Sequence, residues 1–147
     1  MIRTAVAEDL PVLVDIWRRA ALHAHDFLPA AFWEARVDDM VTRRLPGCEI
    51  LVLDAGGRVL GFAALDGDHL DALYVEPDVQ SFGYGAQLLA HAMQGRRRIT
   101  LDVYTRNVRA VSFYHRMGFT AIGEQADPDS GESETRMEWC AEPSAMA

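Results

Sequence analysis

The chain has 147 residues, of which 50% are hydrophobic and 24% are charged, as expected for one folded domain and not for a disordered chain. Its 14 basic residues are all arginine and are outnumbered by 22 acidic residues, which gives a formal net charge of -8. This sign disfavours nucleic acids and anionic membranes as partners and favours small cations. The lack of lysine excludes enzymes that need a lysine Schiff base or a P-loop lysine.

Cysteine content and hydropathy exclude further classes. Two cysteines without CxxC or HExxH spacing predict neither a disulfide framework nor a metal site. No apolar run approaches the roughly 18 residues of a membrane span, and the first residues lack the apolar core of a secretory signal. We therefore expect a soluble, cytoplasmic protein without a bound metal.

The first third of the chain predicts a short strand followed by two helices. Residues 2–5 form the strand, and Glu8 and Asp9 then open a helix over 7–24, where acidic side chains complement the helix dipole. Apolar residues recur at helical spacing through this segment. A second helix is predicted over residues 30–45, ended by Pro46 and Gly47.

From there the pattern alternates with a period of two. Residues 49–54, 58–65 and 69–76 read as a three-stranded antiparallel meander joined by glycine-containing turns. The rest of the chain predicts a crossover helix into a parallel strand, then another helix and two strands, so that the sheet is mixed. These elements are expected over residues 86–93, 99–104, 108–117, 119–125 and 134–140, in a single domain of residues 1–141 with a flexible tail over 142–147.

The junction between the third strand of the meander and the next helix predicts a phosphate site. The strand ends in LYVEP (residues 73–77), and QSFGYGA (residues 80–86) opens the helix. Unpaired amides at a helix N-terminus attract phosphate, and glycine lets a ligand approach the main chain. A strand-to-helix turn that needs glycine for its backbone alone explains the same fragment equally well.

A second segment, NVRAVSFYHRMGF (residues 107–119), combines an asparagine at a helix start with a tyrosine two turns later and a Gly-Phe entry into a strand. Together with LYVEP and QxxGxG, it makes nearly the whole chain resemble the GNAT superfamily of acyl-coenzyme A-dependent N-acyltransferases. The resemblance implies an α/β (α+β) fold with a mixed sheet of about seven strands and about four helices on its two faces.

The resemblance also implies roles for individual residues. The strand carrying Leu73, Tyr74 and Val75 splays from its neighbour and pairs with the pantetheine arm, while a bulge amide polarises the thioester carbonyl. Asn107 contacts the coenzyme, and Tyr114 protonates the leaving thiolate. Arg106 and Arg109 flank Asn107 and are either contacts of the 3′-phosphate or solvated side chains. The pyrophosphate loop is formed by Gln80, Ser81, Phe82, Gly83, Tyr84, Gly85 and Ala86.

Thioester aminolysis needs both an acid and a base. A phenol close to the sulfur is a feasible acid for a thiolate, although a half-buried tyrosine packing on the sheet is the alternative for Tyr114. An alkylammonium must lose a proton before it attacks. The family commonly uses an acidic residue on the fourth strand as the base, and the matching position here is His69, with Asp71 on the same strand face. An exposed strand-end histidine is the alternative, and Asp71 is also a candidate holder of the substrate's cation.

The segment joining the first two helices lines the acceptor cleft in this family. His25, Asp26 and Phe27, with Trp17 on the first helix, are the candidate substrate-binding residues. Core packing of the aromatic residues and surface exposure of the histidine are the alternative.

These features predict an N-acetyltransferase that moves an acetyl group from acetyl-CoA to a primary amine in a ternary complex. A catalytically silent acyl-CoA sensor is the alternative. The position of the glycine loop excludes a Rossmann dinucleotide site, and the lack of a GxSxG motif excludes a serine hydrolase. The acyl length, the amine, and the choice between monomer and homodimer stay open.

Overall fold

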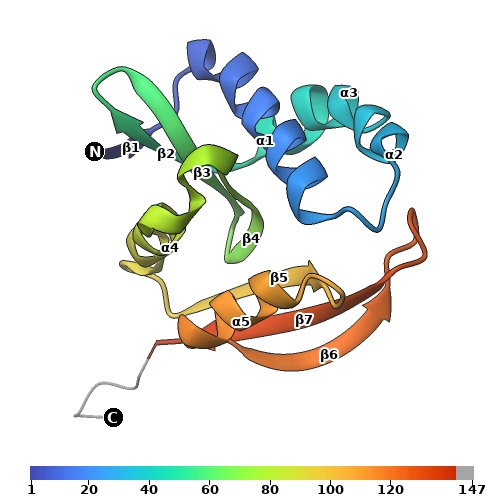
Figure 1. Cartoon of the computed structure of the whole chain (residues 1–147). Helices are drawn as coiled ribbons and strands as arrows, with labels where there is room; N and C mark the ends of the chain where they lie inside the picture. Colours follow the sequence, from blue (N-terminus) through green and yellow to red (C-terminus); the bar gives the residue numbers. More distant parts are fainter. Residues whose placement is uncertain (142–147) are drawn as a thin grey trace, which may run out of the picture.

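The computed structural model describes residues 1–141, which contain a seven-stranded sheet in the order β1-β2-β3-β4-β5-β7-β6 (Figure 1). All neighbouring strands are antiparallel except β4 and β5, which are parallel. The mixed sheet and the meander are therefore confirmed. The strands are β1 (Ile2–Thr4), β2 (Glu49–Ala55), β3 (Arg58–Asp66), β4 (His69–Val75), β5 (Arg98–Tyr104), β6 (Thr120–Ala126) and β7 (Ser133–Cys140).

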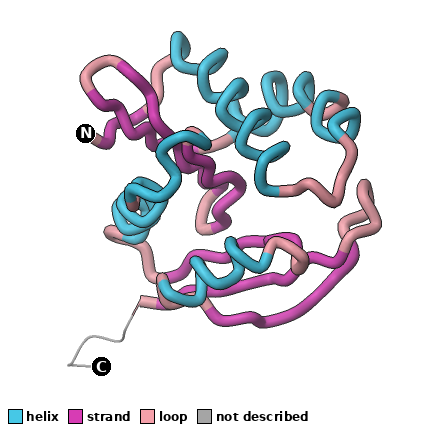
Figure 2. The backbone as a smooth tube through the Cα atoms, in the orientation of Figure 1, coloured by secondary structure: helices cyan, strands magenta, loops and turns pink. Residues whose placement is uncertain are grey.

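Helices cover both faces of this sheet (Figures 1 and 2). The helices α1 (Leu10–Ala24), α2 (Ala30–Glu34) and α3 (Val37–Asp39) lie on one side, whereas α4 (Tyr84–Met93) and α5 (Val108–Arg116) pack on the other. Predicted and observed boundaries of the strands and of these two long C-terminal helices agree within two residues. The predicted tail, residues 142–147, lies outside the described residues.

The start of the first helix is organised by Asp9. A 3-10 turn (Ala7–Asp9) precedes α1, and the Asp9 carboxylate accepts a hydrogen bond from the Val6 amide at 2.8 Å. Arg3 holds the same carboxylate with two hydrogen bonds of 2.8 and 2.9 Å. Asp9 thus joins β1 to the start of α1, in addition to its favourable position in the helix dipole.

The prediction of one continuous helix over residues 30–45 is wrong. The segment consists of α2, α3, a π-helix (Met40–Arg44) and a 3-10 turn (Leu45–Gly47). Met40 and Leu45 are both 1% exposed, yet they are five residues apart, whereas an α-helix repeats its inward face after three or four. The wider π turn brings both side chains into the core, and the proline that follows cannot continue an α-helical ladder.

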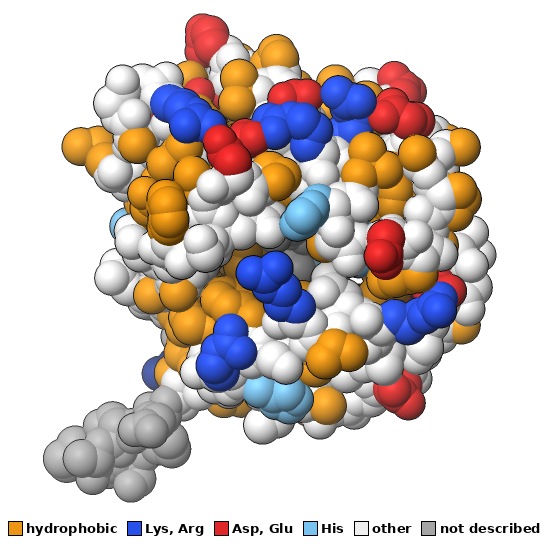
Figure 3. All heavy atoms as spheres, viewed as in Figure 1, with side chains coloured by type: hydrophobic (Ala, Val, Ile, Leu, Met, Phe, Trp, Pro, Cys, Tyr) orange, Lys and Arg blue, Asp and Glu red, His pale blue; other side chains and the backbone are white. Residues whose placement is uncertain are grey.

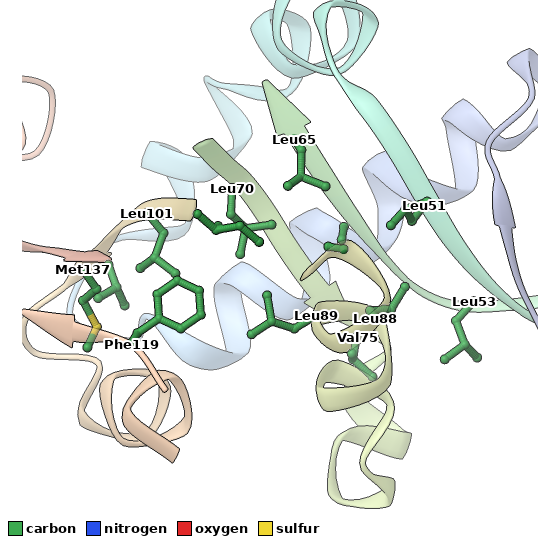
Figure 4. Packing of buried hydrophobic residues seen from close by; sticks show 14 of the residues in the cluster. Leu51, Leu53, Leu65, Leu70, Val75, Leu88, Leu89, Leu101, Phe119 and Met137 are labelled. Atoms are coloured by element: carbon green, nitrogen blue, oxygen red, sulfur yellow. The ribbon is translucent and has the colours of Figure 1, made fainter. Parts of the chain in front are cut away.

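Two apolar cores fill the layers on either side of the sheet. On the α4 side, Leu88 and Leu89 pack with strand residues that include Leu70 and Leu101 (Figure 4). On the α1 side, Trp17 packs with strand residues such as Phe62. Successive residues of β2 and β3 alternate between the two cores, as the period of two predicts.

None of the helices in residues 1–141 combines the length and apolar character needed to cross a membrane. Over the same residues, His, Cys, Asp and Glu side chains form no group of three or more suited to hold a metal ion.

Candidate active site

The site is built where β4 and β5 separate. They pair at a single position, His69 with Thr100, and then diverge, as the ribbon in Figure 1 shows. Residues 73–75 pair with β3 on one side and have no strand partner on the other among the described residues. The splay that the family resemblance implied is therefore confirmed, and it leaves one backbone edge of β4 available to a ligand.

A β-bulge interrupts β4 close to this opening. Ala72 pairs with Ala64 and Leu70 pairs with Leu65, so Asp71 has no opposite residue on β3. Bulges redirect backbone groups beside active sites. The bulge expected from the resemblance is present, and its centre is Asp71.

The glycine loop follows directly from the end of β4. A 3-10 helix (Pro77–Phe82) ends at Gly83, whose φ of 82° is the left-handed conformation that favours glycine. Gly83 is also the N-cap of α4, so the first amides of α4 have no partner within the helix and lie at its positive end. Gln80 Nε2 donates to the Val75 carbonyl at 3.2 Å and ties the loop to β4.

Tyr114 lies on α5, on the same side of the sheet as this loop. Its ring contacts Phe113 and Phe119 edge-on, with centroids 5.2 and 5.5 Å away. Within the described chain no hydrogen bond engages its hydroxyl. Burial, and secondarily Tyr74, raises the pKa of Tyr114 well above its usual range. The phenol is therefore protonated at any physiological pH and has a proton to donate.

One cavity of about 740 Å³ connects these features. Its wall includes Tyr114, residues 73–75 of β4 and the glycines of the loop, and it extends to His25 and Trp33 on the opposite side of the sheet. On the face shown in Figure 3, arginine side chains lie beside a hollow near the middle of the surface. The cavity thus spans the opening between β4 and β5 and is lined from both sides of the sheet.

Comparison with known proteins identifies this arrangement. The model of the acetyltransferase (GNAT) domain family matches residues 46–121. The chain is also 36% identical over 132 residues to the peptidyl-lysine N-acetyltransferase YjaB of Salmonella typhimurium, covering 89% of this chain and 90% of that protein. The chain belongs to the GNAT acetyltransferase family. It is an acyltransferase, as its motifs predicted.

Solved structures agree with this assignment. The solution structure of the apo form of YjaB from Escherichia coli is 32% identical and superposes with a TM-score of 0.82, covering 95% of this chain and 96% of that one. The structure of yncA from Salmonella typhimurium with its cofactor acetyl-CoA is 23% identical, covers 99% and 98% of the two chains, and has a TM-score of 0.68. The second likeness concerns the fold alone.

Most of the residues assigned to coenzyme binding in this GNAT protein line the cavity. The cavity wall contains Leu73, Tyr74, Val75, Gln80, Ser81, Gly83, Gly85, Ala86 and Asn107. Phe82 and Tyr84 are not part of it; Phe82 is 62% exposed and packs edge-on against Tyr84. Arg109 also lines the cavity, whereas Arg106 pairs with Glu132 at 3.2 Å.

The side chain of Asn107 makes two hydrogen bonds among the described residues. Its Oδ1 accepts a hydrogen bond from the Ala110 amide at 3.2 Å and caps α5, while its Nδ2 lies 3.1 Å from His25 Nε2. Because Oδ1 is the acceptor, Nδ2 donates to the imidazole, and the neutral ring then carries its proton on Nδ1. Asn107 thereby links the helix that bears Tyr114 to the segment between α1 and α2.

The candidate acceptor residues divide into two pairs. His25 and Trp17 line the cavity, with exposures of 6% and 2%. Asp26 is exposed, and Phe27 packs against His25 and Tyr104 outside the cavity wall. The His25 ring stacks on Trp33 with centroids 5.0 Å apart and meets Tyr104 edge-on at 5.2 Å. These rings form an aromatic wall, defined here as His25, Trp33 and Tyr104.

The two candidate bases lie in different surroundings. His69 is outside the cavity wall, at the closed end of the splay, where its Nδ1 lies 2.9 Å from Thr100 Oγ1. Asp71 lines the cavity, but its carboxylate is 3.2 Å from Arg44 Nη2 on the π-helix. Asp71 therefore has a cationic partner among the described residues, while His69 lies away from the cavity wall, and the role of either residue as the base stays a prediction.

Several cavity residues were missed from sequence. Tyr104, Trp33 and Glu134 lie in the cavity wall. Trp33 lies among the aromatic residues that follow the first helix, and Tyr104 ends a strand whose inward face is visible from alternation. Glu134 has no local signal, because its position opposite Tyr104 depends on the pairing of β5 with β7.

Burial of His25 predicts a pH-dependent stability. Burial lowers the pKa of His25 to about 4 from its ordinary value near 6.5. Between these values the unfolded chain binds a proton that the folded chain does not, so stability falls as the pH drops from about 6.5 to 4 and is fully present above 6.5. At about 1.4 kcal/mol per pKa unit, the loss is about 3 kcal/mol.

Urea unfolding of the wild type and of His25→Phe at pH 7.5 and pH 4.5 measures this contribution. Loss of the hydrogen bond to Asn107 lowers the free energy of unfolding of the variant equally at both pH values. This loss therefore cancels when the change in stability between the two pH values is compared. We expect the wild type to lose more stability on acidification than the variant. An equal loss in both proteins would show that His25 is not the group responsible.

Proposed function

We propose that this chain transfers the acetyl group of acetyl-CoA to the side-chain amine of lysine in peptides or proteins. The observation that carries the proposal is the single cavity that joins Tyr114 and the free edge of β4 to an aromatic and acidic wall across the sheet. Relatives that carry the name peptidyl-lysine N-acetyltransferase support the choice of acceptor.

The coenzyme half of the cavity fits the donor. Acetyl-CoA supplies the activated thioester. The unpaired edge at residues 73–75 is available to pair with a pantetheine arm, and the amides after Gly83 suit a pyrophosphate. Gly83 and Gly85 have no side chain of their own to hinder the approach of a phosphate to the main chain. A backbone amide of the bulge at Asp71 is expected to donate to the thioester carbonyl.

Tyr114 is the proposed general acid. Tyr114 lines the cavity, its hydroxyl has no hydrogen-bond partner among the described residues, and its raised pKa keeps it protonated. It donates this proton to the sulfur as the carbon–sulfur bond breaks. Both cysteines lie outside the cavity wall, so neither thiol is placed to accept the acetyl group. The amine therefore attacks the thioester directly, without a covalent enzyme intermediate.

The acceptor half favours a cation with an apolar stem. Five carboxylates and four arginines line the cavity, so its lining is slightly acidic, and the chain as a whole carries a formal charge of -8. The aromatic wall can pack against methylene groups. A lysine side chain combines four methylenes with an ammonium, whereas an anionic acceptor would be repelled.

Acetyl-CoA and a set of matched peptides test this function. Peptides with a blocked N-terminus and one lysine should gain one acetyl group, as measured by mass spectrometry and by thiol release. The same peptides with arginine or norleucine in place of lysine should remain unmodified. Acetylation only of free N-termini or of polyamines would refute the lysine assignment, and tight acetyl-CoA binding without any amine turnover would favour a sensor.

A further inference from the structure

Two of the five carboxylates that line the cavity have no arginine partner among the described residues. Asp71 pairs with Arg44, Asp102 with Arg136, and Asp129 with Arg36. The fourth, Asp127, accepts hydrogen bonds from the hydroxyls of Tyr104 and Ser130 at 2.7 and 2.8 Å. The fifth, Glu134, forms no ion pair with any residue in 1–141. Of the two, Asp127 is already compensated by these hydroxyls and by the Asp129 amide, so Glu134 carries the charge that a cationic ligand in this cavity could neutralise.

The position of Glu134 places this charge at the aromatic wall. Glu134 lies near the start of β7, directly opposite Tyr104 on β5 and Gln125 on β6. Cross-strand partners project to the same face of a sheet, so Glu134 shares the face on which Tyr104 packs with His25 and Trp33. A carboxylate beside aromatic rings matches a primary ammonium at the end of an aliphatic chain.

The neighbours of Glu134 also favour proton uptake. Burial and the nearby carboxylates of Asp127 and Asp102 raise the pKa of Glu134, whereas a hydrogen bond from Gln125 and the charge of Arg136 act in the opposite direction. Tyr104, which faces it from β5, stays neutral because burial and Asp127 raise the pKa of its phenol. A carboxylate with a raised pKa holds a proton more readily, which is what a general base near neutral pH requires.

We propose that the Glu134 carboxylate binds the primary ammonium of the acceptor and removes its proton. This inference rests on the proposed lysine acetyltransferase function and assigns the base that it lacks. The proton passes from nitrogen to the Glu134 carboxylate, and the freed nitrogen lone pair forms the bond to the acetyl carbon. The carbon–sulfur bond breaks and the sulfur takes the Tyr114 proton to leave as the thiol. The nitrogen loses its second proton as the amide forms, and this proton restores the Tyr114 phenol through solvent, while Glu134 releases its own proton to water.

Glu134→Gln tests the inference, with Glu124→Gln as the matched control. Glu124 lies on β6, is exposed and is outside the cavity wall, so it controls for the loss of one negative charge. The probe is Nα-acetyl-lysine methylamide, titrated by NMR into protein saturated with CoA. We expect its affinity to fall tenfold or more in E134Q and to be unchanged in E124Q.

The pH profile separates proton removal from a structural role. With acetyl-CoA and a lysine peptide, kcat/KM of E134Q should fall about 10²-fold or more at pH 7. The difference in kcat/KM between E134Q and the wild type should become smaller toward pH 10. A growing fraction of the lysine amine is then already deprotonated in solution and needs no base on the enzyme. Glu134→Asp, which keeps the charge, should retain more activity than E134Q. A deficit that is constant with pH would overturn the role as a base.

The two assays distinguish failure of the inference from failure of the proposed function. Equal probe binding by wild type and E134Q would overturn the inference, whatever the activity. Glu134-dependent probe binding by a wild type that acetylates no lysine peptide would refute the proposed reaction and support the cation site.

Discussion

Replacing Tyr114 with phenylalanine is expected to lower kcat about 10²- to 10⁴-fold, the usual contribution of a positioned general acid. The phenyl ring can keep its edge-on contacts with Phe113 and Phe119, so only the hydroxyl is removed. That hydroxyl has no hydrogen bond to any described residue, so its loss leaves no partner unsatisfied. Steady-state thiol release at saturating acetyl-CoA and peptide measures the effect.

Binding and stability serve as controls for Tyr114→Phe. The dissociation constant of acetyl-CoA, measured by calorimetry, and the midpoint of thermal unfolding should both stay close to those of the wild type. A variant with normal kcat and weakened acetyl-CoA binding would make Tyr114 a binding residue. A variant with full activity would refute the assignment of the general acid.

Trp17→Ala is expected to destabilise the fold by about 3 to 5 kcal/mol, as truncation of a buried tryptophan does. Trp17 is 2% exposed, meets Trp33 edge-on at 6.1 Å and belongs to the core between α1 and the sheet. A loss of this size is a large part of the 5 to 15 kcal/mol by which a domain is usually stable. Urea unfolding followed by circular dichroism measures it.

Val12→Ala is the matched control on the same helix. Val12 is 44% exposed, so its truncation should change the free energy of unfolding by about 0.5 kcal/mol or less. Trp17→Phe should recover much of the stability, because it restores most of the buried ring volume. Unchanged stability in Trp17→Ala with a raised KM for the acceptor would instead make Trp17 a substrate-binding residue.

Local signals were sufficient for most of the architecture. Alternation identified the strands of the meander, because successive side chains of each strand point alternately to the two cores. The glycine loop was recognisable because Gly83 needs a backbone conformation that other residues rarely adopt. The segment after Glu34 was the exception: its irregular turns follow from how Met40 and Leu45 reach the core.

The chemistry of the acceptor side needed contacts between distant segments. Asp71 was chosen as a base or cation holder from its place on β4, but its salt bridge to Arg44 depends on the π-helix that packs nearby. His25 was chosen as a substrate contact, and its hydrogen bond to Asn107 spans 82 positions of sequence. Such contacts carry no periodic or local pattern.

Short-range spacing was enough to predict the order of strands and helices along the chain, the glycine loop, the family and the tyrosine proposed as the acid. The point where β4 and β5 part, the arginine partners of the carboxylates and the place of Glu134 beside the aromatic wall emerge from the folded chain alone. Charge pairing and burial depend on which strands become neighbours, and the register between β5 and β7 is set by packing across the whole sheet.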